Sequence, residues 1–345
     1  MNTIPIITDL EVSPNHWVLN DEDDVLRFVE IMSVAEAIPR LLSVEQLDIE
    51  VGTIDTGLSH RLALLLDKHA SALHITHLRL AQSEKFLGAD LEVAESLSKL
   101  VSLKKVYIDE FDETAAFMLM LSYSQLELVE VSVVPSPQAE IYDVTKPLAF
   151  LHHSWATLTT LTMSGPLTGL GDEEFPMVRD LGIELSDTLS TRDIARVFPN
   201  LCMLTLLESV FTNANSERLQ EARARNQAEP RGKVLWHDLT HVVGDVSDVY
   251  TLALPNQVRF LTVTAMSKED SQRFGIIVKD ANPGYLSLTT SCARIGKQPN
   301  ILRMLRQKRG GKGIRFELHI EIQPDDTEAD VRTALVRDPM RRQCL

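Results

Sequence analysis

Residues 198–206 read Phe-Pro-Asn-Leu-Cys-Met-Leu-Thr-Leu, with leucine at positions 201, 204 and 206. The spacing is an apolar residue, two others, an apolar residue, one other, and an apolar residue. Successive side chains of a strand point to opposite faces, so the leucines at 204 and 206 share one side of an extended chain. The stretch therefore predicts a short strand that is apolar on one side only.

The same spacing recurs along the chain, and a repeat of this kind decides the architecture of a protein. A single match means little in a chain with 49 leucines among 345 residues, but eight matches follow one another from the N-terminus in steps of 20 to 37 residues. The nine matches are Ile7-Leu10-Val12, Val44-Leu47-Ile49, Ile75-Leu78-Leu80, Leu103-Val106-Ile108, Leu126-Val129-Val131, Leu158-Leu161-Met163, Val178-Leu181-Ile183, Leu201-Leu204-Leu206 and Val258-Leu261-Val263.

Between these strands the apolar period lengthens from two residues to about 3.6, which predicts helices. Asp21 and Asp90 are each placed to cap a helix, and Ser190 with Asp193 forms a pattern typical of a capping box. Further helices are expected over residues 59–69, 113–122, 146–155 and 216–227. Each strand–loop–helix unit has one apolar face that only a neighbouring unit can cover, which is the principle of a solenoid.

The Leu-x-x-Leu-x-Leu skeleton of residues 7–264 resembles that of leucine-rich repeats. Phe198-Pro199-Asn200-Leu201 is similar to the entry of such repeats in F-box proteins, as is the stretch 151–163, and the irregular spacing resembles fungal F-box-like proteins. The resemblance implies an α/β solenoid, with a curved parallel sheet on the concave side and helices on the convex side. It also implies a substrate receptor of a ubiquitin ligase, although no recognisable F-box precedes the repeats.

Two regions are expected: a leucine-rich-repeat array over residues 1–264 and degenerate repeats that form a C-terminal cap over residues 265–345. A separate small α/β domain is the alternative for the second region. Within it we expect strands at Gly275–Lys279, Leu286–Thr290 and Ile314–Ile322 and helices at Asn300–Lys308 and Thr327–Arg337.

The residues that point outward from the strands would form the concave surface of the array. They are acidic in the first repeats, of mixed charge and polarity in the next repeats, and apolar near the end. Protein partners bind to exposed apolar groups that lie beside charged ones. The predicted partner-binding residues are Asp48, Glu50, Arg79, Lys105, Tyr107, Asp109, Glu130, Met203, Leu207 and Phe260. The expected function is therefore that of a non-catalytic protein–protein interaction module.

The net charge and the sequence motifs argue against several other classes of protein. The net charge of −15 argues against a nucleic-acid binder or a polybasic membrane anchor, and it is divided into −19 over residues 1–200 and +4 over residues 201–345. Three scattered cysteines and the lack of a signal-peptide pattern or an apolar run long enough to span a bilayer indicate a cytoplasmic or nuclear protein. No histidines, cysteines or carboxylates have the spacing of metal ligands, and no glycines have that of a dinucleotide-binding motif, so no metal or other cofactor is expected. Gly310-Gly311-Lys312-Gly313 lacks the pattern of a phosphate-binding loop.

A (β/α)₈-barrel enzyme of unknown reaction is the alternative from another class. The length and the count of about eight strand–helix units permit it. The steps of 20 and 23 residues leave little room for a returning helix with catalytic loops, and the predicted strand ends carry no cluster of Asp, Glu, His or Lys.

Overall fold

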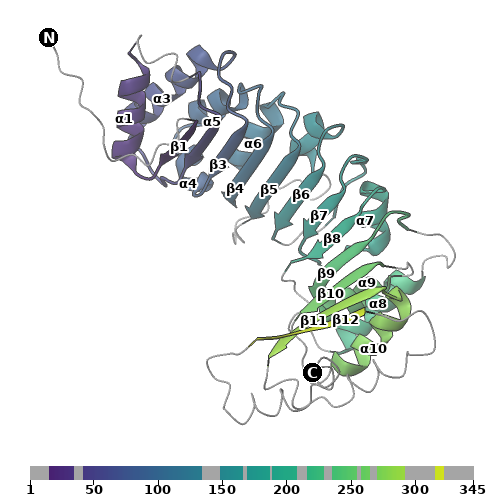
Figure 1. Ribbon diagram of the computed structural model, residues 1–345. Helices are drawn as coiled ribbons and strands as arrows, with labels where there is room; N and C mark the ends of the chain where they lie inside the picture. The colour runs from purple at the N-terminus through teal and green to yellow at the C-terminus, as the bar shows by residue number, and fades with distance from the viewer. Residues whose placement is uncertain are drawn as a thin grey trace, which may run out of the picture. The chain divides into compact units, whose positions relative to one another are not determined.

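The computed structural model is a mixed α/β structure (Figure 1). It describes residues 15–34, 42–133, 148–165, 169–186, 189–207, 216–228, 235–254, 258–264, 270–291 and 315–321. The chain divides into two compact units, residues 1–163 and 164–345.

Within each unit the described strands pair in parallel and follow one another in the order of the sequence. The first unit contains β1 (His16–Leu19), β2 (Gln46–Ile49), β3 (His77–Leu80), β4 (Lys105–Phe111), β5 (Leu128–Val133) and β6 (Thr160–Ser164), whose last residue falls at the boundary. The second unit contains β7 (Asp180–Ile183), β8 (Met203–Leu206), β9 (His241–Asp245), β10 (Phe260–Thr264), β11 (Tyr285–Ser291) and β12 (Arg315–Glu321).

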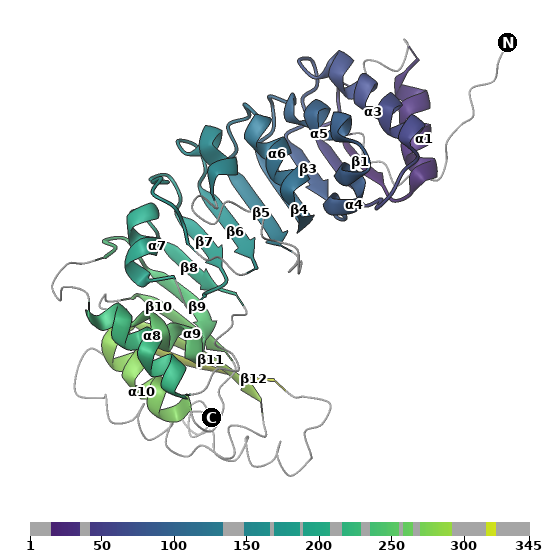
Figure 2. The same ribbon diagram turned by 180° about the vertical axis from the view of Figure 1, so that it is seen from behind.

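In each unit the described helices lie on one face of the strands, and none of them covers the other face (Figure 2). The first unit has α1 (Glu22–Met32), α3 (Thr56–His69), α4 (Ser83–Gly88), α5 (Leu91–Ser98), α6 (Glu113–Leu121) and a 3₁₀ helix, η2 (Ala149–Ser154). The second has α7 (Thr191–Val197), α8 (Ser216–Ala228), α9 (Val246–Leu252) and α10 (Asp270–Ala281).

Eight of the nine predicted strands are confirmed, as β2 to β8 and β10, and the ninth, at Ile7–Val12, lies outside the described residues. The sequence reading missed β1 and β9. In β9, Gly244 stands where the pattern requires its third apolar residue. A Cβ there would come within 2.9 Å of the Cβ of Leu206 on the neighbouring strand, so packing excludes the residue type that the pattern needs.

The predicted helix caps are confirmed: Asp21 and Asp90 accept bonds from the first turns of α1 and α5, and Ser190 with Asp193 forms a capping box on α7. The strand predicted at Gly275–Lys279 is wrong, because this segment lies within α10. Its apolar run cannot distinguish strand from helix by itself. The buried residues around it show the helical spacing, since they are Phe274, Ile277, Val278 and Ala281.

Near the C-terminus, the strands predicted at Leu286–Thr290 and Ile314–Ile322 are confirmed as β11 and β12, with each boundary shifted by one residue. They extend the strand order of the second unit beyond β10. The helices predicted at Asn300–Lys308 and Thr327–Arg337 and the glycine-rich stretch at 310–313 lie outside the described residues.

The core of each unit lies between the strands and the helices. The inward residues of adjacent strands, such as Leu47, Leu78 and Val106, are fully buried and follow one another in register. Helices contribute aromatic rings: Phe28 of α1 lies edge-on to Trp17 of β1, with ring centroids 5.4 Å apart. The apolar positions of the repeat therefore form one continuous core within a unit.

Serine hydroxyls join consecutive repeats of the first unit at the helix-to-strand turns. Ser102 donates to the carbonyl oxygen of Ile75 at 2.8 Å, and Ser154 donates to that of Ser124 at 3.1 Å. Ser154 Oγ also accepts the backbone N–H of Leu126 at 3.2 Å, so it closes two bonds to the preceding repeat.

Replacing Ser154 with alanine is expected to destabilise the first unit by about 2 kcal/mol, because two buried backbone groups lose their partner. Urea unfolding followed by circular dichroism measures this change. The matched control is Thr159→Ala, which removes a similar hydroxyl-to-carbonyl bond at an exposed position and is expected to cost less than half as much. Equal losses in the two variants would contradict the role assigned to Ser154.

The described strands do not form an eight-stranded barrel. A barrel closes by pairing its first strand with its last. In the first unit the order runs from β1, which pairs only with β2, and in the second it ends at β12, which pairs only with β11. The barrel alternative drawn from the sequence is therefore wrong for the described chain.

Candidate functional site

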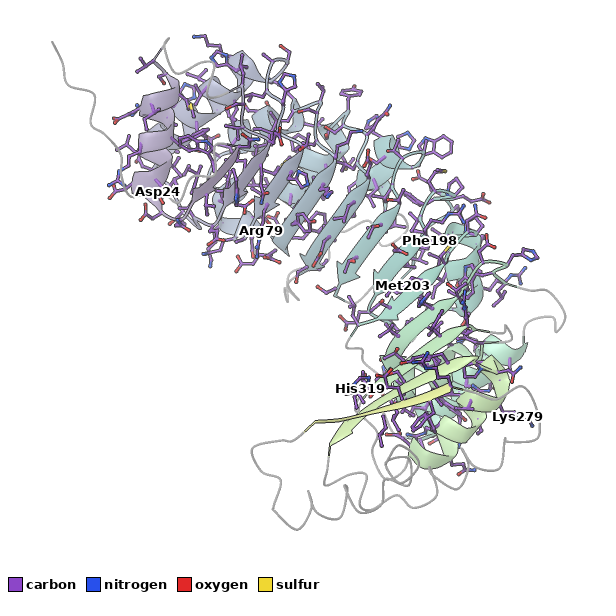
Figure 3. All side chains as sticks on the ribbon, viewed as in Figure 1. Asp24, Arg79, Phe198, Met203, Lys279 and His319 are labelled. Carbon is purple, nitrogen blue, oxygen red and sulfur yellow. The ribbon has the colours of Figure 1, made fainter. Side chains whose placement is uncertain are left out.

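The open strand face of the first unit brings together predicted residues from four strands. Parallel pairing places Asp48 of β2 beside Arg79 of β3, Arg79 beside Tyr107 of β4, and Tyr107 beside Glu130 of β5. These four side chains therefore form one row across the strands, although 82 residues of sequence separate its ends. Arg79 is labelled on the strand side in Figure 3.

Burial within this row is uneven. Arg79 and Glu130 are exposed and Tyr107 is partly exposed. Asp48 is only 8% exposed, because His16 Nε2 lies 3.0 Å from one of its carboxylate oxygens and the amide of Gln46 donates to the carboxylate. Asp48 therefore presents little surface, although it is among the partner-binding residues predicted from the sequence.

The remaining predicted residues of the first unit lie beside this row. Asp109 is exposed and its carboxylate lies 3.9 Å from the guanidinium of Arg79, while Glu50 and Lys105 are partly exposed. Lys105 is in register with His77 of β3. Partial burial lowers the pKa of His77, and the charge of Lys105 lowers it further, whereas Glu45 and Asp48 act in the opposite direction.

The open strand face of the second unit carries a row of rings. Met203 of β8 pairs with His241 of β9, His241 with Phe260 of β10, Phe260 with Tyr285 of β11, and Tyr285 with Arg315 of β12. The His241 and Phe260 rings stack with centroids 4.4 Å apart and an angle of 10° between their planes. The Phe260 and Tyr285 centroids are 5.6 Å apart. We call His241, Phe260 and Tyr285 the aromatic row.

The sequence pointed to Met203 and Phe260 but missed the two other rings. His241 was missed because β9 was not recognised, and Tyr285 because it was not assigned to the outward face. The signal available in the sequence was the repeat position itself, since each ring is the first residue of its strand. Leu207, also predicted, lies one residue past the end of β8 and is partly exposed.

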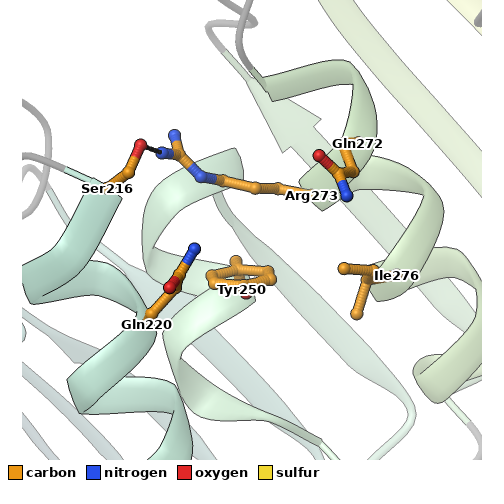
Figure 4. A pocket seen from close by; sticks show the side chains of 6 residues that line it. All are labelled: Ser216, Gln220, Tyr250, Gln272, Arg273 and Ile276. Atoms are coloured by element: carbon orange, nitrogen blue, oxygen red, sulfur yellow. Dashed lines mark hydrogen bonds between the residues drawn. The ribbon is translucent and has the colours of Figure 1, made fainter.

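A pocket of about 430 Å³ lies on the helix side of the second unit, lined by residues of α8, α9 and α10 (Figure 4). Arg273 crosses it, donating to Ser216 Oγ at 2.7 Å and to the carboxylate of Asp270 at 2.9 Å. The other lining residues are Gln220, Tyr250, Gln272 and Ile276. The guanidinium is thus held by this chain's own groups, and the pocket is polar without a free cation aimed into it.

A partly buried carboxyl lies where β9 ends and α9 begins. Asp245 caps α9 by accepting the N–H of Ser247 at 2.7 Å. Burial raises the pKa of Asp245 above its ordinary value, the negative charge of Asp270 adds to this, and the bonds from Ser247 oppose it. Ionised Asp245 is therefore less favourable in the folded chain than in the unfolded chain.

Asp245→Asn is expected to stabilise the second unit at neutral pH. The folded-state pKa lies above the unfolded value of 3.8, so ionisation of Asp245 opposes folding at neutral pH, and this cost disappears as the pH falls toward that value. Asparagine keeps the capping acceptor. Unfolding measured at neutral pH and near the unfolded pKa tests both parts, with Asp55→Asn at the exposed cap of α3 as the matched control. A gain that grows on acidification would contradict this assignment.

A second surface, absent from the sequence predictions, lies at the helix-to-strand turns of the first unit. Val101, Tyr123 and Trp155 follow α5, α6 and η2 and are 59%, 76% and 50% exposed. The ring of Tyr123 lies 4.9 Å from that of His153. Apolar groups exposed together in this way mark contact surfaces in many proteins.

Within the described residues, no three His, Cys, Asp or Glu side chains gather as metal ligands would. His152, His153 and His237 are all exposed there. The same part of the chain contains no helix that combines the length and the apolar character needed to cross a bilayer. Searches of this chain against protein-family models, curated proteins and solved structures find no match.

Proposed function

We propose that this chain is a non-catalytic protein-interaction module of the leucine-rich-repeat type, which binds a protein partner on the outward faces of its strands. In this proposal it acts in the cytoplasm or the nucleus as an F-box-like substrate receptor. No nucleic acid, membrane or cofactor takes part.

One observation carries the proposal. The outward positions of parallel strands align charged, aromatic and apolar side chains in rows, and no described helix covers them. In the first unit the row includes Arg79, Tyr107 and Glu130, and in the second it includes Met203 and Phe260. Protein interfaces favour aromatic residues and arginine at their centres.

The repeat spacing supports the leucine-rich-repeat part of the proposal. Eight strands begin two residues after the first apolar position of each match, and each unit packs its helices on one side. The open row on the other side is then the surface that such repeats offer to partners.

Tyr107→Ala and Phe260→Ala are expected to reduce partner capture about tenfold or more and to leave the melting temperature nearly unchanged, because both rings are partly exposed. The measurement is quantitative affinity purification of the full chain from cells, followed by mass spectrometry. Proteins lost from both variants are the partners of the strand face.

Tyr123→Ala is the matched comparison, since it removes an exposed ring from the helix-to-strand turns of the first unit. Partners that are lost with Tyr123→Ala but retained with both strand-face variants would contradict the proposal. Recovery of cullin complexes among the partners supports the ligase role. If the partners contain no ligase component, the interaction module stands without that role.

A further inference from the structure

The aromatic row of the second unit presents a particular chemistry. His241, Phe260 and Tyr285 come from three adjacent strands: the His241 and Phe260 rings stack, and the Tyr285 ring is tilted by 52° against that of Phe260. An aromatic ring is negative on its faces and positive at its edge, so the edges attract oxygen atoms that carry negative charge.

Two arginines add positive charge to the same surface. The guanidinium carbon of Arg259 lies 5.0 Å from the centroid of the Phe260 ring, and that of Arg315 lies 5.7 Å from the Tyr285 centroid. Both arginines are exposed. Among the described residues, no carboxylate comes within ion-pair distance of either one.

The carboxylates on this side of the unit mostly have other partners. Glu317, two residues along β12 from Arg315, lies 3.4 Å from the ring of His319. The carboxylate of Asp238 lies 3.5 Å from Arg179. Asp180 pairs with Met203, beyond the aromatic row. Its side chain is exposed, so the positive surface ends there. Residues 201–345 as a whole carry 21 basic and 17 acidic side chains.

We propose that the aromatic row with Arg259 and Arg315 binds an extended acidic segment of a partner protein, rich in aspartate and glutamate. This inference rests on the proposed function and names the chemistry of the partner at the second unit. Arg259 directly precedes β10 and Arg315 begins β12, and these two strands lie two positions apart, about 10 Å at the usual strand spacing. Carboxylates two to four residues apart on an extended peptide, at about 3.3 Å per residue, can reach both.

The test uses the full-length chain and a fluorescein-labelled peptide in which glutamate alternates with leucine and serine. The comparison peptide carries glutamine at every glutamate position. Fluorescence anisotropy is expected to show binding of the glutamate peptide about tenfold tighter than that of the glutamine peptide. This preference should shrink as the salt concentration rises, because the contacts are exposed charges.

Charge reversal of both arginines, Arg259→Glu with Arg315→Glu, is expected to abolish the preference for the glutamate peptide. Arg315→Lys, which keeps the charge, is expected to retain most of it. Lys279→Glu reverses one charge on α10, on the helix side of the unit, and serves as the control for each arginine reversed singly. Near-ultraviolet circular dichroism shows which variants are folded, and Phe260→Leu replaces Phe260→Ala if alanine disturbs the fold.

The outcomes separate this inference from the proposed function. Equal binding of the two peptides, or an equal loss from Lys279→Glu, overturns the acidic partner even if Phe260→Ala still releases cellular partners. Unchanged cellular capture by Phe260→Ala and Tyr107→Ala overturns the proposed function. Sedimentation that shows wild-type dimers, lost on reversal of Arg259 and Arg315, makes the occupant a second copy of this chain and also overturns the inference.

Discussion

Trp236→Ala is expected to lower the free energy of unfolding of the second unit by about 4 kcal/mol. The indole is 1% exposed and its N–H donates to the carbonyl oxygen of Phe198 at 2.8 Å. Truncation of a buried tryptophan to alanine typically costs about 3–5 kcal/mol, because it leaves a cavity. The Phe198 carbonyl, at the C-terminal end of α7, also loses its donor.

Trp155 supplies the matched control, since it is half exposed and follows η2 in the first unit. Trp155→Ala is expected to change the stability by less than about 0.5 kcal/mol. Trp236→Phe keeps most of the volume but not the N–H, so its cost, about 1.5 kcal/mol, isolates the hydrogen bond. Urea unfolding followed by far-ultraviolet circular dichroism measures all three. A Trp155 variant that loses as much as the Trp236 variant would contradict the assigned packing.

Arg223→Ala is expected to destabilise the second unit by about 3 kcal/mol. The side chain is 6% exposed and links three helices: it belongs to α8, donates to the carbonyl oxygen of Tyr250 in α9 at 2.5 Å, and pairs with Asp280 in α10. Its guanidinium carbon lies 4.5 Å from the centroid of the Tyr250 ring. Removal of one partner of a buried ion pair costs about 3–5 kcal/mol. The lower end of this range applies to Arg223, because the Asp280 side chain is 31% exposed.

Hydrogen exchange localises the effect of Arg223→Ala. Amides of α8, α9 and α10 should lose protection, since the linked helices loosen together. Glu221→Ala, at an exposed position of α8, is the control and is expected to change the stability by less than about 0.5 kcal/mol. Arg223→Lys is expected to lie between the two, because lysine keeps the charge and loses the planar fork. A loss of protection spread evenly over β1 to β5 as well would contradict this role.

The alternation of strands and helices was predictable over most of the described chain because it depends on local side-chain spacing. Asp21, Asp90 and Ser190 capped the helices as expected, since a cap bonds to residues two or three positions away. The errors occurred where contacts distant in sequence decide the structure. β9 was not predicted because Gly244 stands in place of an apolar residue of the pattern. Leu206, 38 residues earlier, occupies the space that a side chain there would need.

The candidate site was predictable only in part. Arg79, Tyr107 and Glu130 were assigned to the outward face from strand alternation alone, and the structure places them there. That Asp48 is covered by His16 depends on pairing between β1 and β2, and β1 was not among the predicted strands. The aromatic row requires three strands in register. The spacing of residues within one segment does not show which rings will be neighbours.

The sequence by itself determined that this protein is built from repeated strand–helix units with one apolar face each. That property follows from periods of two and about 3.6 residues, which any short segment carries within itself. Only the tertiary structure decided that Trp236 is buried and Trp155 exposed, and that His241, Phe260, Tyr285 and Arg315 share one surface. The shared surface depends on the register between strands, which pairs residues 19 to 30 positions apart in the sequence.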